Sequence, residues 1–272
     1  MTANATREPL HRYVEHVMGM PVSLALRGRH ADTAEGGAAW TAAMDELREV
    51  DRVFSTYRSD SVISRLDRGE LDLAGCPPVV GEVLALGVRA SAESDGAFST
   101  SLPVPGDRTG RRRLDPSGVV KGWATERAAR YLARLDATDY CLSVGGDITC
   151  RADPRSAPWR IGVEDPRDPA RLIAVVPLRT GAVATSGTAH RGAHLVDART
   201  GLAPTGVASV TVVGPSLTWA DIDATAAYAQ GRRAAQWLRT RPMRSALVVG
   251  ADGVVTTVLP SWTTADCVRS IR

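Results

Sequence analysis

Hydrophobic residues recur along parts of the chain at the spacing of a helix. Trp40, Met44 and Leu47 fall three or four positions apart, so residues 38–53 are expected to form an amphipathic helix. Further helices are predicted at 78–92, at 114–135 after an opening D-P-S-G turn, at 218–231 and at 232–238.

Other segments alternate with a period of two or form short apolar runs, which predicts strands. These are 18–26, 140–144, 159–163, 172–177, 182–186, 194–196 and 208–213, and a hairpin of 245–249 with 254–258. Residues 54–66 are expected to form a polar loop. Helices and strands alternate irregularly and several strands are joined by hairpins, so an α+β fold fits better than a doubly wound sheet.

Composition narrows the classes of function. The 272 residues are 44% hydrophobic and 23% charged, with a net charge of +3, as in an ordinary soluble globular protein. Residues 111–113 are the one run of three basic residues, too short for a nucleic-acid-binding face, so no nucleic-acid partner is expected.

The first residues lack an apolar signal core, and no stretch approaches the roughly 18 apolar residues of a membrane span. With four cysteines that show no C-x-x-C spacing, a cytoplasmic protein with reduced thiols is predicted.

The basic residues are strongly biased. Of 33, one is a lysine, Lys121, and the others are arginines, a bias that a GC-rich genome explains. Because the chain uses arginine wherever any cation would serve, Lys121 is expected where a compact ammonium is needed; the alternative is a surface lysine left by chance. It follows the turn at residues 115–118, whose backbone N–H groups could bind phosphate. An ordinary loop-to-helix junction is equally compatible, and the spacing is not that of a P-loop.

Asp221 and Thr225 lie four positions apart in a predicted helix and therefore share one face, whereas Asp223 lies about 200° round the axis from Asp221. A carboxylate and a hydroxyl one turn apart offer two oxygens to a hard cation. The alternative is capping, with Thr218 as the N-cap residue and Asp221 near the positive end of the helix dipole. From this segment alone, capping is the favoured interpretation.

Two further segments could carry chemistry. His194 and Asp197 could form an acid–base pair, or could belong to a loop that satisfies its own polar groups around Gly201. Residues 145–147, G-G-D, could let the backbone approach a ligand, but a tight turn is favoured. The chain has no G-x-S-x-G elbow, which disfavours a Ser–His–Asp hydrolase.

Ten motifs follow one another in a recognisable order. They are M-G-M-P-V-S, F-S-T-Y-R-S-D-S-V-I-S-R-L, D-G-A-F, L-D-P-S-G-V-V-K-G-W-A, S-V-G-G-D-I, W-R-I-G-V-E-D-P, V-A-T-S-G, H-L-V-D-A-R-T-G, S-V-T-V-V-G-P-S and A-D-I-D-A-T-A. In this order and spacing the chain resembles the ApbE family of flavin transferases, the FAD:protein FMN transferases. The resemblance implies an α+β fold of two closely packed subdomains, with mixed, largely antiparallel sheets flanked by helices and FAD between them. It also implies a single domain over residues 14–260, with 1–13 and 261–272 as terminal extensions.

The implied reaction is a Mg²⁺-dependent transfer of FMN from FAD to a Ser or Thr hydroxyl of an acceptor protein, with release of AMP. Carried over by motif, the cofactor-binding residues are Met18, Tyr57, Ala97, Phe98, Ser99, Asp115, Lys121 and Val196. The implied metal ligands are Gly118, Asp221, Ala224 and Thr225, the glycine and the alanine through their carbonyl oxygens. His194 is the candidate base, with Asp197 as its alternative or as the residue that orients it.

The chain departs from the family pattern at two places. Ser99 stands where the family commonly has an aspartate, which removes one possible cofactor contact, and Ala198 stands where a proline is usual. Two other functions stay open at this stage: a Mg²⁺-dependent FAD pyrophosphatase, with water in place of the acceptor, and a non-catalytic FAD-binding protein. No membrane insertion is expected.

Overall fold

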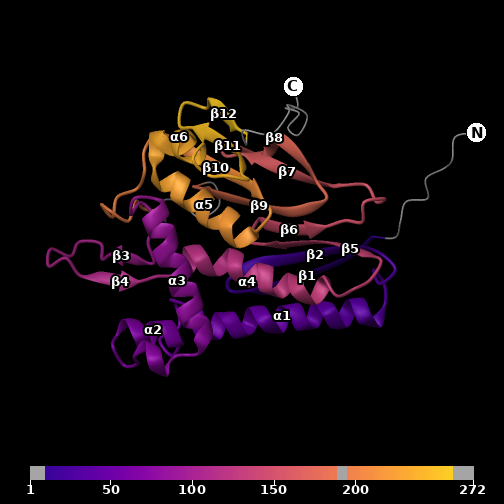
Figure 1. Ribbon diagram of the computed structural model, residues 1–272, viewed down its shortest axis with the longest axis horizontal. Coiled ribbons are helices and arrows are strands. Elements are labelled where there is room, and N and C mark those ends of the chain that lie inside the picture. Colours follow the sequence, from indigo (N-terminus) through magenta and orange to yellow (C-terminus); the bar gives the residue numbers. More distant parts are fainter. Residues whose placement is uncertain (1–9, 189–194, 260–272) are drawn as a thin grey trace, which may run out of the picture.

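One antiparallel sheet runs through the whole molecule. The computed structural model describes residues 10–188 and 195–259, and its eight-stranded sheet has the order β1-β2-β5-β6-β9-β10-β11-β12 (Figure 1). The strands are β1 (Leu10–Val17), β2 (Met20–Gly28), β5 (Thr138–Val144), β6 (Asp147–Arg151), β9 (Thr180–Gly187), β10 (Val207–Gly214), β11 (Ser245–Gly250) and β12 (Val255–Val258). The sheet therefore joins segments from both ends of the chain.

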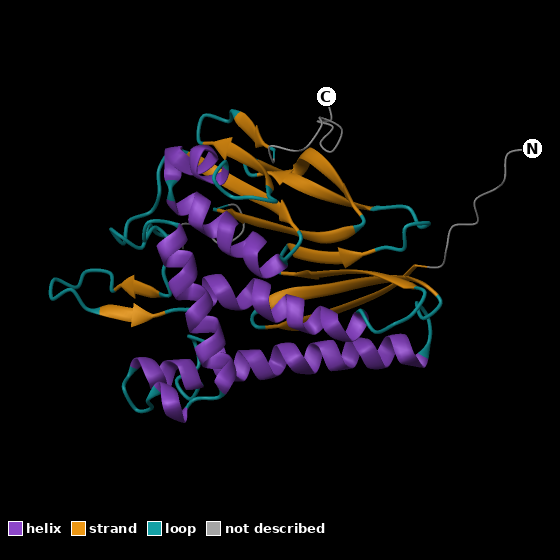
Figure 2. Ribbon diagram, in the orientation of Figure 1, coloured by secondary structure: helices purple, strands orange, loops and turns teal. Residues whose placement is uncertain are grey.

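Helices cover one face of this sheet, as Figure 2 shows. They are α1 (Ala34–Phe54), α3 (Pro78–Glu93), α4 (Ser117–Leu132), α5 (Leu217–Ala229) and α6 (Ala234–Leu238). Two buried clusters lie under them: one packs α1, α3 and α4 on β2 and β5, and the other packs α5 and α6 on β9 to β12. These two clusters on a shared sheet correspond to the two closely packed subdomains, so the predicted fold class is confirmed.

A hairpin of β7 (Trp159–Asp165) and β8 (Asp168–Leu178) supplies a smaller third cluster. Residues such as Ile161 and Val176 of the hairpin pack there with Val183 and Leu247 of the large sheet. A second small hairpin, β3 (Ser101–Pro103) with β4 (Arg112–Leu114), projects from the body of the molecule (Figure 1).

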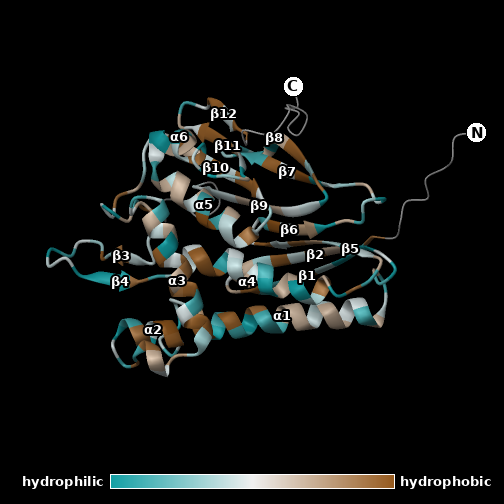
Figure 3. Ribbon diagram, in the orientation of Figure 1, coloured by the Kyte–Doolittle hydropathy of each residue, from teal (hydrophilic) through white to brown (hydrophobic). Residues whose placement is uncertain are grey.

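Helix α1 shows how the pattern of residues determines packing. Its buried positions include Trp40, Ala43, Met44, Leu47 and Val50, which fall on one face, and Figure 3 shows hydrophilic and hydrophobic positions interspersed along it. The side chain of Thr33 caps its first turn by accepting the Gly36 N–H. Burial of such a stripe stabilises a helix that propensity alone would leave marginal.

Several elements differ from the prediction. A short helix, α2 (Val62–Asp67), interrupts the expected polar loop, because the Ser61 hydroxyl caps it by accepting the Ser64 N–H at 3.1 Å. Strand β1 already begins at Leu10, ahead of the predicted domain start at residue 14. Leu195 and Val196 are not in a strand. Cys76, Cys141 and Cys150 are free thiols, as expected; Cys267 lies outside the described residues.

Candidate functional site

A cavity of about 420 Å³ opens beside the first turn of α4. Its volume lies in the range of small-molecule sites, about 300–1,000 Å³. Its walls combine polar groups with apolar surface, and they come from segments spread between Met18 and Thr225. Eleven residues predicted from the sequence line it: Met18, Tyr57, Ala97, Phe98, Ser99, Asp115, Gly118, Lys121, Val196, Asp221 and Thr225. The fold therefore gathers nearly all of the predicted site in one place.

The turn between β1 and β2 presents Met18 to this cavity. Met18 and Gly19 both have positive φ, 57° and 68°, as the two central residues of a tight hairpin turn of type I′ require. A methionine rarely adopts this backbone conformation, and such strain collects at functional sites. Tyr57, which also lines the cavity, is 99% exposed and therefore stands at its mouth.

The polar end of the cavity contains a buried charge cluster. The Lys121 ammonium lies 2.6 Å from Asp147 Oδ2 and 3.4 Å from Asp221 Oδ1. Both aspartates are almost fully buried, whereas the Lys121 side chain is partly exposed. Lys121 is thus no chance surface residue, because a compact ammonium fits between two carboxylates.

Asp147 is the site residue that the sequence interpretation missed. The expected turn is present, with positive φ at Gly145 and Gly146, and it delivers Asp147 to the start of β6. There Asp147 Oδ1 accepts the Thr185 N–H at 3.1 Å while Oδ2 pairs with Lys121. The sequence signal for Asp147 was an acid directly after two glycines, but its partners, Lys121 and Thr185, lie far away along the chain.

Close packing of α4 on α5 positions Asp221. Its Oδ2 accepts the Gly122 N–H at 2.9 Å, and a Cβ atom on Gly122 would come within 2.8 Å of the Asp221 Cβ and 2.7 Å of the Leu217 carbonyl oxygen. Only glycine therefore lets the two helices approach this closely. Burial raises the pKa of Asp221 above its usual range, and the Asp147 carboxylate adds to this, although Lys121 and the Gly122 N–H oppose it.

The oxygens around Asp221 suit a hard cation. The Thr225 hydroxyl lies 3.0 Å from the Ser186 hydroxyl, and a Cβ on Gly118 would lie 3.8 Å from Thr225 Cγ2 and 2.9 Å from the Phe98 ring. The Phe98 ring therefore requires glycine at position 118, whereas the approach to Thr225 is an ordinary van der Waals contact. Among the described residues no three His, Cys, Asp or Glu side chains form a metal cluster, so a cation here would need hydroxyl and carbonyl oxygens as well, with water or substrate oxygens as the remaining ligands. Mg²⁺ accepts such a set.

The capping interpretation of Thr218 is wrong. The N-cap residue of α5 is Ser216, whose hydroxyl accepts the Trp219 N–H. Glu126 of α4 accepts hydrogen bonds from the Ser216 hydroxyl at 2.9 Å and from the Thr218 N–H at 3.0 Å. A carboxylate from a neighbouring helix satisfies the first turn, so Asp221 is not needed as a cap.

Asp223 lies outside the cavity, as its position in the helix predicted. It is fully buried, and its two oxygens accept hydrogen bonds from Arg241 Nε at 2.9 Å and Arg244 Nε at 2.8 Å. Arg241 also pairs with Glu93 at 2.7 Å. These contacts tie α5 to the segment before β11 and to the end of α3.

Two of the predicted residues, Asp197 and Ala224, are not among those that line the cavity, and a third lies outside the described residues. Both oxygens of Asp197 are held by Arg199, at 2.8 and 2.7 Å, and it is not among the residues that line the cavity. Partial burial opposes its ionisation, but Arg199 outweighs this and lowers the pKa of Asp197, which makes it a poor base. Ala224 is fully buried in the cluster under α5, and it too is not among the cavity-lining residues. His194 lies outside the described residues.

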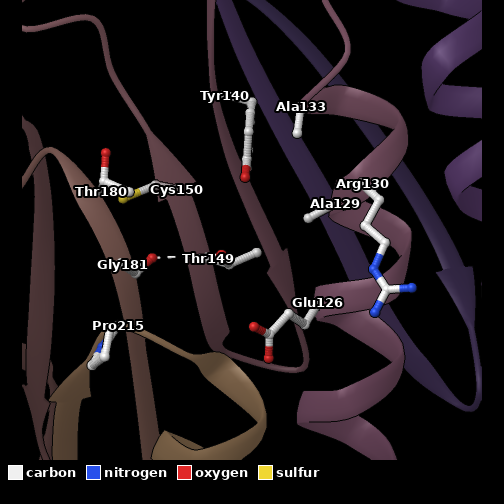
Figure 4. A pocket seen from close by; sticks show the side chains of 10 residues that line it. All are labelled: Glu126, Ala129, Arg130, Ala133, Tyr140, Thr149, Cys150, Thr180, Gly181 and Pro215. Atoms are coloured by element: carbon white, nitrogen blue, oxygen red, sulfur yellow. Dashed lines mark hydrogen bonds between the residues drawn. The ribbon is translucent and has the colours of Figure 1, made fainter.

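A smaller hollow, about 170 Å³, lies along the second half of α4 (Figure 4). Burial raises the pKa of the Cys150 thiol there to about 12 and also raises that of Tyr140. Glu126 already accepts the hydrogen bonds at the start of α5. Neither the thiol nor the phenol is an ionised nucleophile at neutral pH, which leaves the larger cavity as the candidate site.

Known proteins share this fold and these motifs. The ApbE family model matches residues 18–104 and 106–248. The chain is 23% identical to the FAD:protein FMN transferase of Salmonella typhimurium, over 82% of this chain and 79% of that one. Its structure is similar to the ApbE protein of Thermotoga maritima (TM-score 0.77, 21% identity, 92% and 97% of the two chains). It is equally similar to the flavin transferase ApbE of Vibrio cholerae (TM-score 0.77, 22% identity, 93% and 98%).

In the ranges 10–188 and 195–259 no helix has the length and apolar character needed to cross a bilayer.

The family match covers most of the chain, and the motifs that carry it converge on one cavity. The chain is therefore a member of the ApbE family.

Proposed function

We propose that this protein transfers FMN from FAD to a Ser or Thr hydroxyl of an acceptor protein, in a reaction that depends on Mg²⁺ and releases AMP. The observation that carries the proposal is the cavity, whose lining combines apolar surface with the cluster of Lys121, Asp147 and Asp221. A flavin needs apolar surface, and a pyrophosphate needs neighbouring cations and hydrogen-bond donors. Relatives named FAD:protein FMN transferase support the same activity.

Each part of the site has a proposed task. Met18 and Tyr57 contact the flavin or its neighbouring rings, and residues 97–99, Asp115 and Val196 line the rest of the FAD site. Asp221, Thr225 and the Gly118 carbonyl would hold the Mg²⁺ ion. Ala224, carried over by family motif, stays a prediction as a fourth ligand. When bound, that ion would supply charge neutralisation at the pyrophosphate.

The chain's own groups complete the chemistry. Lys121 places a positive charge beside the pyrophosphate and stabilises the negative charge that develops on the departing AMP. The acceptor hydroxyl must lose a proton, and His194 is the proposed base. Asp197 is held by Arg199 and has a lowered pKa, so in this proposal it orients the neighbouring segment and takes no proton.

The test is incubation of the protein with FAD and Mg²⁺, first alone and then with threonine-containing acceptor peptides, followed by mass spectrometry. The expected result is a covalent FMN adduct on the hydroxyl, with one AMP released for each adduct. AMP release that is rapid without any acceptor would favour an FAD pyrophosphatase. Intact FAD in every reaction would favour a binding protein without catalysis.

A further inference from the structure

The ammonium of Lys121 occupies a position between two carboxylates that a divalent cation would also seek. It lies 2.6 Å from Asp147 Oδ2 and 3.4 Å from Asp221 Oδ1. Asp221 Oδ2 is already engaged by the Gly122 N–H, so Oδ1, the oxygen that faces Lys121, has the greater capacity to bind a cation. Lysine and metal therefore compete for the same carboxylate.

Asp147 is placed to bind the Lys121 ammonium more closely than Asp221 does. Its distance to the ammonium is the shorter of the two, and its other oxygen is fixed by the Thr185 N–H of β9. It is 1% exposed, at the start of β6, and follows two glycines in left-handed conformation, so its position is set by the sheet and the turn. A carboxylate fixed in this way holds its partner ammonium in one place.

We propose that Asp147 is a positioning residue that keeps Lys121 from neutralising Asp221 and so leaves Asp221 available to a divalent cation. This inference rests on the proposed function, because it concerns the same cation. Asp147 acts through Lys121: one of its oxygens accepts the Thr185 N–H, and the other forms an ion pair with the ammonium without a hydrogen bond. The family motif assigns no task to this residue.

The test is a double-mutant cycle read out by Mn²⁺ binding to the protein without FAD, with free Mn²⁺ followed by electron paramagnetic resonance. Asp147→Asn frees Lys121 to pair with Asp221, so its Mn²⁺ dissociation constant is expected to rise about tenfold, as for other groups that orient metal ligands. Lys121→Gln removes the competitor and is expected to bind Mn²⁺ more tightly than the wild type. The double variant is expected to resemble Lys121→Gln within about threefold, because Asp147 then has no ammonium to hold.

Three outcomes would overturn the inference. An equal loss of affinity from Asp147→Asn with and without Lys121 would make Asp147 a direct metal ligand. No loss in either background would leave it without any role towards the cation. Weaker binding by Lys121→Gln would contradict competition, and this arm needs no change at the buried aspartate, so it decides the question even if Asp147→Asn fails to fold.

A failure of the proposed function can be distinguished from these outcomes. If wild-type protein binds no Mn²⁺ up to millimolar concentrations, both the cation site and the inference fail. If the wild type binds Mn²⁺ but the cycle shows no coupling, the cation site stands and the inference alone fails. Turnover gives a second readout: activity of Asp147→Asn is expected to recover at raised Mg²⁺, whereas a general loss of structure would lower it at every concentration.

Discussion

Helix α5 carries two buried aspartates that are two residues apart and have opposite surroundings. Asp221 faces a cavity, one partly exposed lysine and a second carboxylate. Asp223 faces two arginines that each donate a hydrogen bond to a separate oxygen, and it is not among the residues that line the cavity. Burial raises the pKa of both, but only Asp223 has as many cations as it has oxygens.

The contrast shows how a structural charge differs from a functional one. Arginine presents a planar fork that satisfies a carboxylate and stays with it, which suits a fixed link between elements. Lysine presents a single charge that two carboxylates can share, so the arrangement retains capacity for another cation. Among the described residues, Asp221 shares one ammonium with Asp147, whereas Asp223 pairs with two arginines.

The largest effect on stability is expected from Asp223→Ala. It leaves Arg241 and Arg244 partly buried without their carboxylate, and removing one partner of a buried pair costs about 3–5 kcal/mol. Urea unfolding followed by circular dichroism measures this cost. Asp60→Ala, which removes an exposed partner of Arg58, is the control and should unfold like the wild type. A loss of turnover without loss of stability would contradict the structural role of Asp223.

Asp221→Asn is expected to lower turnover strongly while leaving the stability of the protein almost unchanged. Asparagine can still accept the Gly122 N–H and removes a buried charge, so the free energy of unfolding should change by less than about 1 kcal/mol. Turnover should fall by about 100-fold or more, because the charge that matters in the transition state is gone. Steady-state AMP release and FAD affinity, measured on one preparation, separate the two effects. Full activity in this variant would remove Asp221 from the proposed metal site.

Lys121→Arg addresses the cation of the same cluster. A guanidinium is larger than an ammonium and binds carboxylates through two donors, so it should remain on Asp221 and compete more strongly with the metal. We expect turnover to fall about tenfold, with a higher Mg²⁺ requirement and little change in stability. A silent substitution would mean that any cation serves at this position.

The smallest effect concerns Asp197, whose chain neighbours Val196 and Ala198 line the cavity. Arg199 lowers its pKa, so its contribution to stability is present above its unfolded pKa, near 4, and is lost as the pH falls through the lower folded value. The stability difference between the wild type and Asp197→Asn, expected to be below about 1 kcal/mol, should therefore shrink between pH 6 and pH 3. Acid titration of unfolding measures it. Loss of all turnover in this variant would restore Asp197 as the base.

Much of the site could be predicted from short motifs, because they carry the residues that line the cavity. The face shared by Asp221 and Thr225 followed from helical geometry, and so did the divergence of Asp223. The contacts of Asp147 could not be predicted, since a G-D pair after a strand is an ordinary turn. Its partners become neighbours only in the folded chain, Thr185 through the pairing of β9 with β6 and Lys121 through the packing of α4 beside β6. The cap was misassigned because Glu126 approaches α5 from another helix.

Four elements, β1, β3, β4 and α2, were not predicted from the sequence, and the reasons are again physical. Strand β1 is an edge strand whose exposed positions, Leu10, Arg12, Val14 and His16, mix apolar and basic side chains, so its sequence shows no clear alternation of apolar and polar faces. Strands β3 and β4 are three residues each, below the length at which alternation can be recognised. Helix α2 covers six residues and depends on its serine cap more than on periodicity.

The order of strands in the large sheet has a consequence for how the protein folds. Cavity residues come from Met18 near the beginning of the chain and from Thr225 near its end, and β9 must pair with β6 before Thr185 can reach Asp147. A nascent chain that has emerged only through β8 lacks both Asp221 and the strand that fixes Asp147. On the proposed function, flavin binding is accordingly expected only of a chain in which β9 and α5 have joined the fold, and recovery of flavin binding during refolding would test this.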